Sequence, residues 1–215
     1  EDRTLKIAGM TEPMYFVDTA SCKAKREDNN SDSTVHSNSL EADICGEMIS
    51  KIIDAIENDE YSYGNKKPVL KGTDGYYDIG VITAYKAQIP LLKKSILKRL
   101  SSTHDKKTAK DMVDHLYVNT LDSFQGRDNQ IIIYSFVRSN LRHTIGFQNE
   151  VRRLNVMMTR AKSLLIMVGD SETLTNTKAL TVHDNKRACE YYTDLIDYCK
   201  ENAGYIDYSK EHSHE

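Results

Sequence analysis

Short apolar runs alternate with helical patterns along most of this chain of 215 residues. The strand-type runs lie at 14–19, 79–83, 116–120, 130–136 and 163–168. Apolar residues at helical spacing predict helices at about 38–56, 89–100, 151–161 and 185–201. Strands that are separated by helices in this way form a parallel sheet. The sequence therefore predicts an α/β fold with a mainly parallel sheet and helices on both faces.

Two polar stretches interrupt this pattern, at 20–37 and 57–77, and we expect both to be flexible insertions. The first is rich in Ser, Asn, Asp and Lys, and the second contains several glycines. The end of the chain, 206–215, is expected to be a disordered tail. The remaining length suits one domain, so residues 1–205 are assigned to a single domain.

The distribution of charge restricts how the chain meets nucleic acid. The formal net charge is −3, which argues against a polycation that coats nucleic acid without discrimination. Basic residues are concentrated instead: positions 127–162 contain six Arg and one Lys against the acids Asp128 and Glu150. Such a distribution permits nucleic-acid contact on one face of the molecule.

The four cysteines form no Cys-x-x-Cys pair, and the seven histidines have no ligand spacing with them. We therefore expect no metal site and no disulfide framework. Reduced thiols are typical of an intracellular protein. No apolar run is long enough to span a bilayer, so no membrane association is expected.

The stretch 151–170, VRRLNVMMTRAKSLLIMVGD, places basic residues on a predicted helix that runs into an apolar strand. These residues are Arg152, Arg153, Arg160 and Lys162. Guanidinium groups are permanently charged forks that match phosphate oxygens. The cluster therefore indicates a polyphosphate, either on a nucleotide or along a nucleic-acid backbone. For any one of these arginines alone, a surface ion pair is the simpler interpretation.

A second stretch, YVNTLDSFQGRDNQIIIYSF at 117–136, reads as a strand, a polar turn at Gln125-Gly126 and a buried strand. Open α/β sheets place their ligands in loops at strand ends. The order of strand, polar loop, strand, arginine-rich helix and strand therefore strengthens the case for a ligand that carries phosphate.

The two stretches resemble motifs V and VI of superfamily one helicases, in the group of the up-frameshift and senataxin-type RNA/DNA helicases. Residues 79–88, IGVITAYKAQ, resemble a third motif of that group, V-I-T-P-Y followed by Gln. The resemblance is close over 79–170 and looser at 14–19 and 37–41. It implies a three-layer RecA-like domain, the second and C-terminal one of the two that such a helicase carries.

The resemblance assigns one set of residues to the nucleotide. Arg160, in T-R-A, matches the catalytic arginine finger that reaches the γ-phosphate of ATP. The other nucleotide-binding candidates are Gln125, Gly126, Asp128 and Arg153. Asp128 stands where the family usually has Glu, the acid that touches the ribose, and is one methylene shorter. For Arg153, a structural ion pair with an acid such as Asp128 is the alternative.

The resemblance assigns a second set of residues to the nucleic acid, namely Thr83, Tyr85, Thr120 and Ser123. Hydroxyl groups suit contacts to phosphate or to a 2′-hydroxyl, but Thr120 and Ser123 are also common turn residues. Tyr85 has two interpretations, since its ring either stacks on a base or packs in the core. Ala84 replaces the proline that the motif usually carries.

The chain contains neither a G-x-x-x-x-G-K-[ST] phosphate loop nor an acidic Mg²⁺ motif. The resemblance therefore implies that ATP with Mg²⁺ is bound mainly by an N-terminal RecA-like domain of the same protein. We expect the chain alone not to hydrolyse ATP. The expected function is the C-terminal motor domain of an ATP-dependent helicase on single-stranded RNA or DNA, in the nucleus or the cytoplasm.

Two other functions stay open. A degenerate helicase-like domain would bind nucleic acid or act as a scaffold without ATPase activity, and the departures at Ala84 and Asp128 favour it slightly. A stand-alone nucleotide-binding α/β enzyme is disfavoured, because the sequence presents no catalytic base, nucleophile or glycine-rich phosphate loop.

Overall fold

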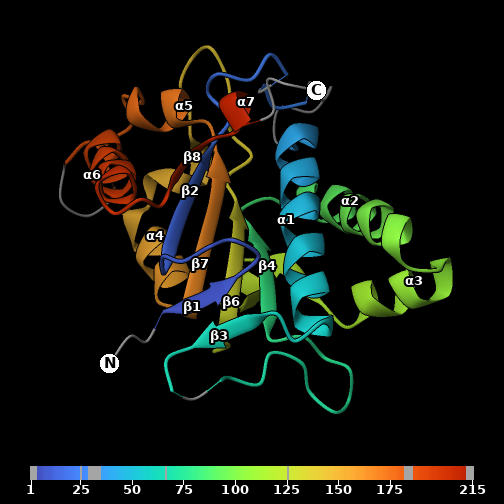
Figure 1. Ribbon diagram of the computed structural model, residues 1–215. Helices are drawn as coiled ribbons and strands as arrows, with labels where there is room; N and C mark the ends of the chain where they lie inside the picture. Colours follow the sequence, from blue (N-terminus) through green and yellow to red (C-terminus); the bar gives the residue numbers. More distant parts are fainter. Residues whose placement is uncertain are drawn as a thin grey trace.

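Six parallel strands form the central sheet of the computed structural model, which describes residues 4–24, 26–28, 35–65, 67–124, 126–181 and 186–211 (Figure 1). The spatial order is β5-β4-β6-β7-β2-β8, and every neighbouring pair is parallel. The strands are β2 (Met14–Asp18), β4 (Ile79–Thr83), β5 (Tyr117–Thr120), β6 (Asn129–Ser135), β7 (Ala161–Gly169) and β8 (Tyr205–Asp207). Every residue of β4 is buried, as expected for a parallel strand that is covered on both faces.

Helices cover both faces of this sheet (Figure 1). One face carries α1 (Ser39–Glu57), α2 (Gln88–Thr103) and α3 (Lys106–Asp114), and the other carries α4 (Val151–Met158), α5 (Ser171–Thr175) and α6 (Ala188–Glu201). Residues of β6 alternate between the two cores: Ile131 and Ile133 pack on the α1–α3 side, and Ile132 and Tyr134 on the α4–α6 side. The predicted three-layer α/β fold is confirmed. Among the described residues, no helix has the length and apolar character needed to cross a membrane.

Helix α3 is not evident from the sequence, which predicts only a polar connection at 101–107. In the structure α2 continues to Thr103 and α3 begins at Lys106. The Asp105 side chain caps α3 by accepting hydrogen bonds from two backbone amides of its first turn. Burial of Ala109 against the α1–α3 core adds the contact that so short a helix needs.

The strands of the sheet all begin at one edge, called here the amino edge, and all end at the opposite one, the carboxyl edge. The segment between β5 and β6 crosses from the carboxyl edge to the amino edge. Both strands run parallel to β4, so residues 121–128 return the chain from the carboxyl edge to the amino edge. Phe124 anchors this crossing: it is fully buried, and a Cβ placed on Gly80 would lie 2.9 Å from its ring. Residues at the start of the crossing therefore lie at the carboxyl edge, and residues at its end lie at the amino edge.

The segment 57–77, expected to be a flexible insertion, contains regular structure among its described residues. Strand β3 (Tyr61–Tyr63) pairs antiparallel with β1 (Leu5–Ile7), and Leu70 and Tyr77 are buried. The structure departs from the expectation because these few apolar residues pack against the α1–α3 core, which a local polar composition does not reveal. Position 66 lies outside the described residues.

The other expected insertion, 20–37, is described only in part, since positions 25 and 29–34 lie outside the described residues. Its described parts are tied to each other: the Asp28 carboxylate accepts hydrogen bonds from Ser37 Oγ at 2.9 Å and from Ser39 Oγ at 3.1 Å. This end of the segment is thereby linked to the first residue of α1.

The tail expected to be disordered, 206–215, contributes to the sheet. β8 pairs with β2, and α7 (Tyr208–Glu211) follows it, whereas 212–215 lies outside the described residues. The Tyr205 ring stacks on Phe16 with centroids 6.5 Å apart, and its hydroxyl donates to the Asp18 carboxylate at 2.6 Å. These contacts join residues far apart in sequence, so no local pattern predicts them.

Substituting Gly204 by Ala should detach β8. An added Cβ would lie 2.0 Å from the Met14 backbone oxygen, which cannot move without distorting β2. Overpacking of this kind costs roughly 1–3 kcal/mol, so we expect the urea midpoint of the 215-residue chain to fall.

Gly72→Ala is the matched control, because the one atom that lies closer than 3 Å to its added Cβ is the end of the flexible Asp74 side chain. Equal urea midpoints for wild type and Gly204→Ala would contradict the position of β8.

Candidate functional site

Arg160 and Asp128 meet at the amino edge of the sheet. Arg160 directly precedes β7, and Asp128 directly precedes β6. The Arg160 carbonyl accepts a hydrogen bond from the Asn129 amide at 3.0 Å, and Arg160 Nη1 lies 3.0 Å from Asp128 Oδ1. The Arg160 side chain is 24% exposed, and its buried Nε has no hydrogen-bond partner. A partly exposed guanidinium is suited to a phosphate oxygen.

Gly126 shapes the turn that leads to Asp128. Its φ is +78°, which glycine adopts without strain, and a Cβ placed there would meet nothing within 4 Å. The turn therefore needs glycine for its backbone conformation and not for close packing. The neighbouring candidate, Gln125, lies outside the described residues.

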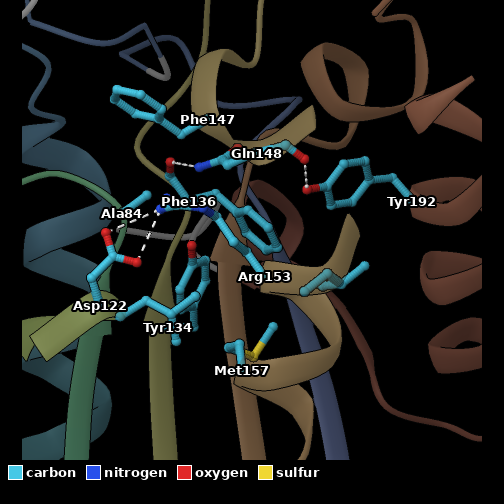
Figure 2. Close-up of a pocket in the computed structure, with 11 residues that line it drawn as sticks. Ala84, Asp122, Tyr134, Phe136, Phe147, Gln148, Arg153, Met157 and Tyr192 are labelled. Atoms are coloured by element: carbon cyan, nitrogen blue, oxygen red, sulfur yellow. Dashed lines mark hydrogen bonds and ion pairs between the residues drawn. The ribbon is translucent and has the colours of Figure 1, made fainter. Parts of the chain in front are cut away.

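Arg153 lies near the opposite end of α4 from Arg160. Its guanidinium contacts Asp122 at 3.2 Å and Glu150 at 3.0 Å, and Figure 2 shows the Asp122 contact. Asp122 follows β5, so this cluster lies toward the carboxyl edge. Seven residues of helical rise separate the two arginines by about 10 Å. The structure therefore does not place Arg153 beside Arg160, and its acidic partners are Asp122 and Glu150, not Asp128.

The hydroxyl candidates lie together at the carboxyl edge, but they differ in exposure. Thr83 is fully buried, and its carbonyl accepts a hydrogen bond from the Leu121 amide at 3.0 Å. Thr120 is 7% exposed, and its Oγ1 lies 3.0 Å from Oγ of the exposed Ser123. Of these three side chains, Ser123 is therefore the one that solvent reaches readily.

The structure favours the packing interpretation of Tyr85. Its side chain is buried, with the ring 5.0 Å from the His36 ring and 6.1 Å from the Phe147 ring. Its hydroxyl donates to the Ile145 carbonyl at 3.4 Å and accepts from Arg138 Nη1 at 3.4 Å. A ring enclosed in this way presents no open face to a base.

A buried polar network beneath the carboxyl edge centres on Glu41, which the sequence does not single out. Glu41 is fully buried, and its Oε2 accepts hydrogen bonds from Ser135 Oγ and the Val137 amide, both at 2.7 Å. Gln88 Nε2 donates to Ser135 Oγ at 3.1 Å and to the Asn38 carbonyl at 3.0 Å. The network joins the start of α1, the start of α2 and the end of β6. The N-cap pattern N-x-x-E at 38–41 was the signal that could have identified it.

Burial keeps the Glu41 carboxyl protonated near neutral pH. Loss of solvation raises its pKa from 4.5 to about 8, despite the hydrogen bonds from Val137 and Ser135 that favour the charged form. The carboxylates of Asp170 and Glu27 act in the same direction as burial. A neutral Glu41 can then donate a hydrogen bond as well as accept them.

Arg138 is a second residue that the sequence patterns did not indicate as a site residue, although it follows a predicted strand. It is 7% exposed, and its guanidinium contacts Glu27 at 2.8 Å and Thr144 at 2.8 Å. Arg138 lines a surface pocket of about 400 Å³ together with Arg26 and Arg142. Glu27 lines the same pocket and pairs with Arg138, and Arg26 pairs with Asp170 at 3.6 Å, so part of this positive charge is neutralised. Within the part of the chain that the structure describes, no three His, Cys, Asp or Glu side chains gather as a metal site.

Residues 2–172 match the protein family described as "AAA domain". The chain is 31% identical over 210 residues to the DNA-binding protein SMUBP-2 of Mesocricetus auratus, covering 94% of this chain and 18% of that protein. It is 40% identical over 96 residues to Helicase sen1 of Schizosaccharomyces pombe, covering 45% and 5%. It is 45% identical over 98 residues to the DNA replication ATP-dependent helicase/nuclease DNA2 of Saccharomyces cerevisiae, covering 45% and 6%.

The parallel sheet and the ordered motifs define a RecA-like helicase domain. The chain belongs to the AAA domain family and, within it, to the superfamily one helicases of the up-frameshift and senataxin type. It spans between 5% and 18% of the length of the three relatives named above.

The raised pKa of Glu41 predicts a pH dependence of stability that Glu41→Gln removes. Between pH 4.5 and about 8 the folded state holds a proton that the unfolded state releases. Stability due to this group is therefore full at low pH and falls as pH rises, by about 1.4 kcal/mol per pH unit. Above pH 8 no further loss is expected.

The measurement is the free energy of unfolding in urea between pH 5 and 8 for wild type and Glu41→Gln. The free energy of unfolding of Glu41→Gln should increase relative to that of the wild type as pH rises. Glu60→Gln, at an exposed carboxylate, is the control and should follow the wild type. Parallel curves for Glu41→Gln and wild type would show that Glu41 does not bind this proton.

Proposed function

We propose that this chain is the C-terminal motor domain of an ATP-dependent RNA/DNA helicase and that Arg160 is its arginine finger. The observation that carries the proposal is the Arg160–Asp128 pair, which unites motif VI and motif V at one accessible edge of the sheet. The family membership of the chain and the printed name of its relative DNA2, an ATP-dependent helicase/nuclease, support it.

In this proposal the ion pair with Asp128 fixes the position of the Arg160 guanidinium while no nucleotide is bound. ATP, held mainly by an N-terminal RecA-like domain with Mg²⁺, supplies the phosphoryl group that is transferred to water. Arg160 then neutralises charge on the γ-phosphate oxygens, a contribution worth about 10³–10⁵ in rate in related hydrolases. Asp128 is released toward the ribose, and Gly126 lets the backbone turn at that place.

The single strand of RNA or DNA lies, in this proposal, along the carboxyl edge. Ser123 contacts it through its exposed hydroxyl, and the backbone around Thr83 and Thr120 contributes amide and carbonyl groups. Arg142, which is exposed in the pocket that follows β6, attracts the phosphates. The intact protein works on nucleic acid in the nucleus or the cytoplasm.

The second candidate function is a degenerate helicase-like module that binds nucleic acid or acts as a scaffold without ATPase activity. The observation that favours it is the ion pair itself. The Asp128 carboxylate already binds the Arg160 guanidinium that would otherwise contact phosphate, and Asp is shorter than the usual Glu. The two functions differ in whether removal of Arg160 changes any rate.

Arg160→Ala in the full-length protein should reduce nucleic-acid-stimulated ATP hydrolysis at least about a hundredfold, or roughly 3 kcal/mol in the barrier. Nucleotide binding should remain, since the other domain provides most of the contacts. Because an ion pair that solvent reaches contributes only about 0–1 kcal/mol to stability, and this pair is partly exposed, the urea midpoint should change little. The measurements are the steady-state hydrolysis rate and equilibrium binding of a fluorescent ATP analogue.

Arg99→Ala is the matched control, since Arg99 on α2 pairs with Glu47 on the neighbouring α1 at 3.7 Å, on the opposite face of the sheet from α4. Its hydrolysis rate should equal that of the wild type. An unchanged rate in Arg160→Ala would remove Arg160 from catalysis. An inactive wild type that still binds single strands would favour the degenerate module.

A further inference from the structure

Phe147 is a large apolar side chain that is exposed to solvent at the carboxyl edge beside Tyr85. It lies in the short 3-10 helix η2 (Gly146–Asn149), and 62% of the residue is exposed. A single exposed aromatic residue is ordinary by itself. The features that set Phe147 apart are the rigidity of the turn that carries it and the groups that surround it.

The turn is held on both sides of Phe147. On one side Gly146 has a φ of +57°, and a Cβ placed there would lie 2.6 Å from Tyr85 Oη and 2.9 Å from Arg138 Nη1. On the other side Gln148 donates a side-chain hydrogen bond to the Phe136 carbonyl, and its own carbonyl accepts from Tyr192 Oη at 2.7 Å. Contacts at Gly146 and at Gln148 therefore hold the turn against the domain, while the Phe147 side chain between these two residues points outward.

The space beneath Phe147 offers no alternative position for its ring. The pocket that it shares with Tyr134, Phe136 and Tyr192 has only about 10 Å³ of free space, roughly one water molecule. Figure 2 shows the Phe147 ring pointing away from the side chains that fill this pocket. The ring therefore cannot turn into this pocket.

The neighbours of the exposed ring suit a nucleotide unit. The Arg153 guanidinium lies 5.7 Å from the ring centroid, and Ala84 and Asp122 line the same pocket. Ser123, the exposed hydroxyl candidate, directly follows Asp122. An aromatic ring with a cation over one face can stack a base on its other face, and polar groups beside it can contact the sugar and phosphate.

We propose that Phe147 stacks on a base of the bound single strand, a role that rests on the proposed function. Tyr85, enclosed beneath it, supports the turn instead of meeting the base. Stacking on an aromatic face tolerates any base, so the contact adds affinity without sequence preference. The same ring holds RNA and DNA equally well, because it touches neither the 2′-hydroxyl nor the base edges.

The test measures binding of a fluorescent single-stranded oligothymidine to the full-length protein. Phe147→Ala should weaken binding about tenfold or more, the loss expected for one stacked base. Phe147→Trp should retain the wild-type affinity, because it keeps the aromatic face. Tyr198→Ala is the matched control, since Tyr198 is also exposed but lies on α6.

A second probe separates stacking from a structural role. An oligonucleotide of the same length with abasic sites keeps the phosphates and removes the bases. Wild type and Phe147→Ala should bind this probe equally, since no base remains to stack. An equal loss on both probes would overturn the proposal, as would an unchanged affinity of Phe147→Ala for oligothymidine.

The outcomes also distinguish this inference from the proposed function. A wild-type protein that fails to bind any single strand would overturn both. A wild type that binds normally, with a Phe147→Ala variant that binds equally well but hydrolyses ATP more slowly, would overturn stacking alone. That result would assign Phe147 to contact with the neighbouring RecA-like domain.

Discussion

The parallel direction of all six strands is the constraint on which the rest of the structure depends. Every strand must be entered at the same edge, so each connection has to carry the chain back across the sheet. This requirement sends α4 from the carboxyl edge to the amino edge and delivers Arg160 to the point where β7 begins. It also sends residues 121–128 along the same course and delivers Asp128 to the start of β6. The parallel topology of the sheet therefore brings Arg160 and Asp128 close enough to form their ion pair.

Burial of a carboxyl group beneath the carboxyl edge holds together the side of the domain that we propose for nucleic acid. Glu41 has no solvent contact, and it accepts hydrogen bonds from the end of β6. Gln88 extends the network to the start of α2, next to the loop that carries Tyr85. A buried network that is nearly satisfied fixes one arrangement of its elements. The loops above it are therefore held in place from below.

Much of the fold could be predicted from the sequence, because β4, β6 and β7 are continuous apolar runs and the principal helices have apolar residues at helical spacing. Helix α3 and strand β8 could not, since a capping side chain and the Tyr205–Asp18 hydrogen bond stabilise them. At the site, the motifs indicated Arg160 directly. The motifs could not show whether the Tyr85 ring is buried, because its burial depends on the turn at Gly146, which packs closely against the Tyr85 hydroxyl.

The crossing segment 121–128 has a consequence for how the two proposed ligands would influence each other. It carries Ser123 at the end proposed for the single strand and Asp128 at the end proposed for the nucleotide, with Phe124 wedged against the sheet between them. If both proposed sites are occupied, a backbone shift that this segment transmits from one end would change the free energy of binding at the other. Thermodynamic linkage makes this influence reciprocal. By whatever factor a bound strand changes the affinity for ATP through this segment, ATP changes the affinity for the strand by the same factor.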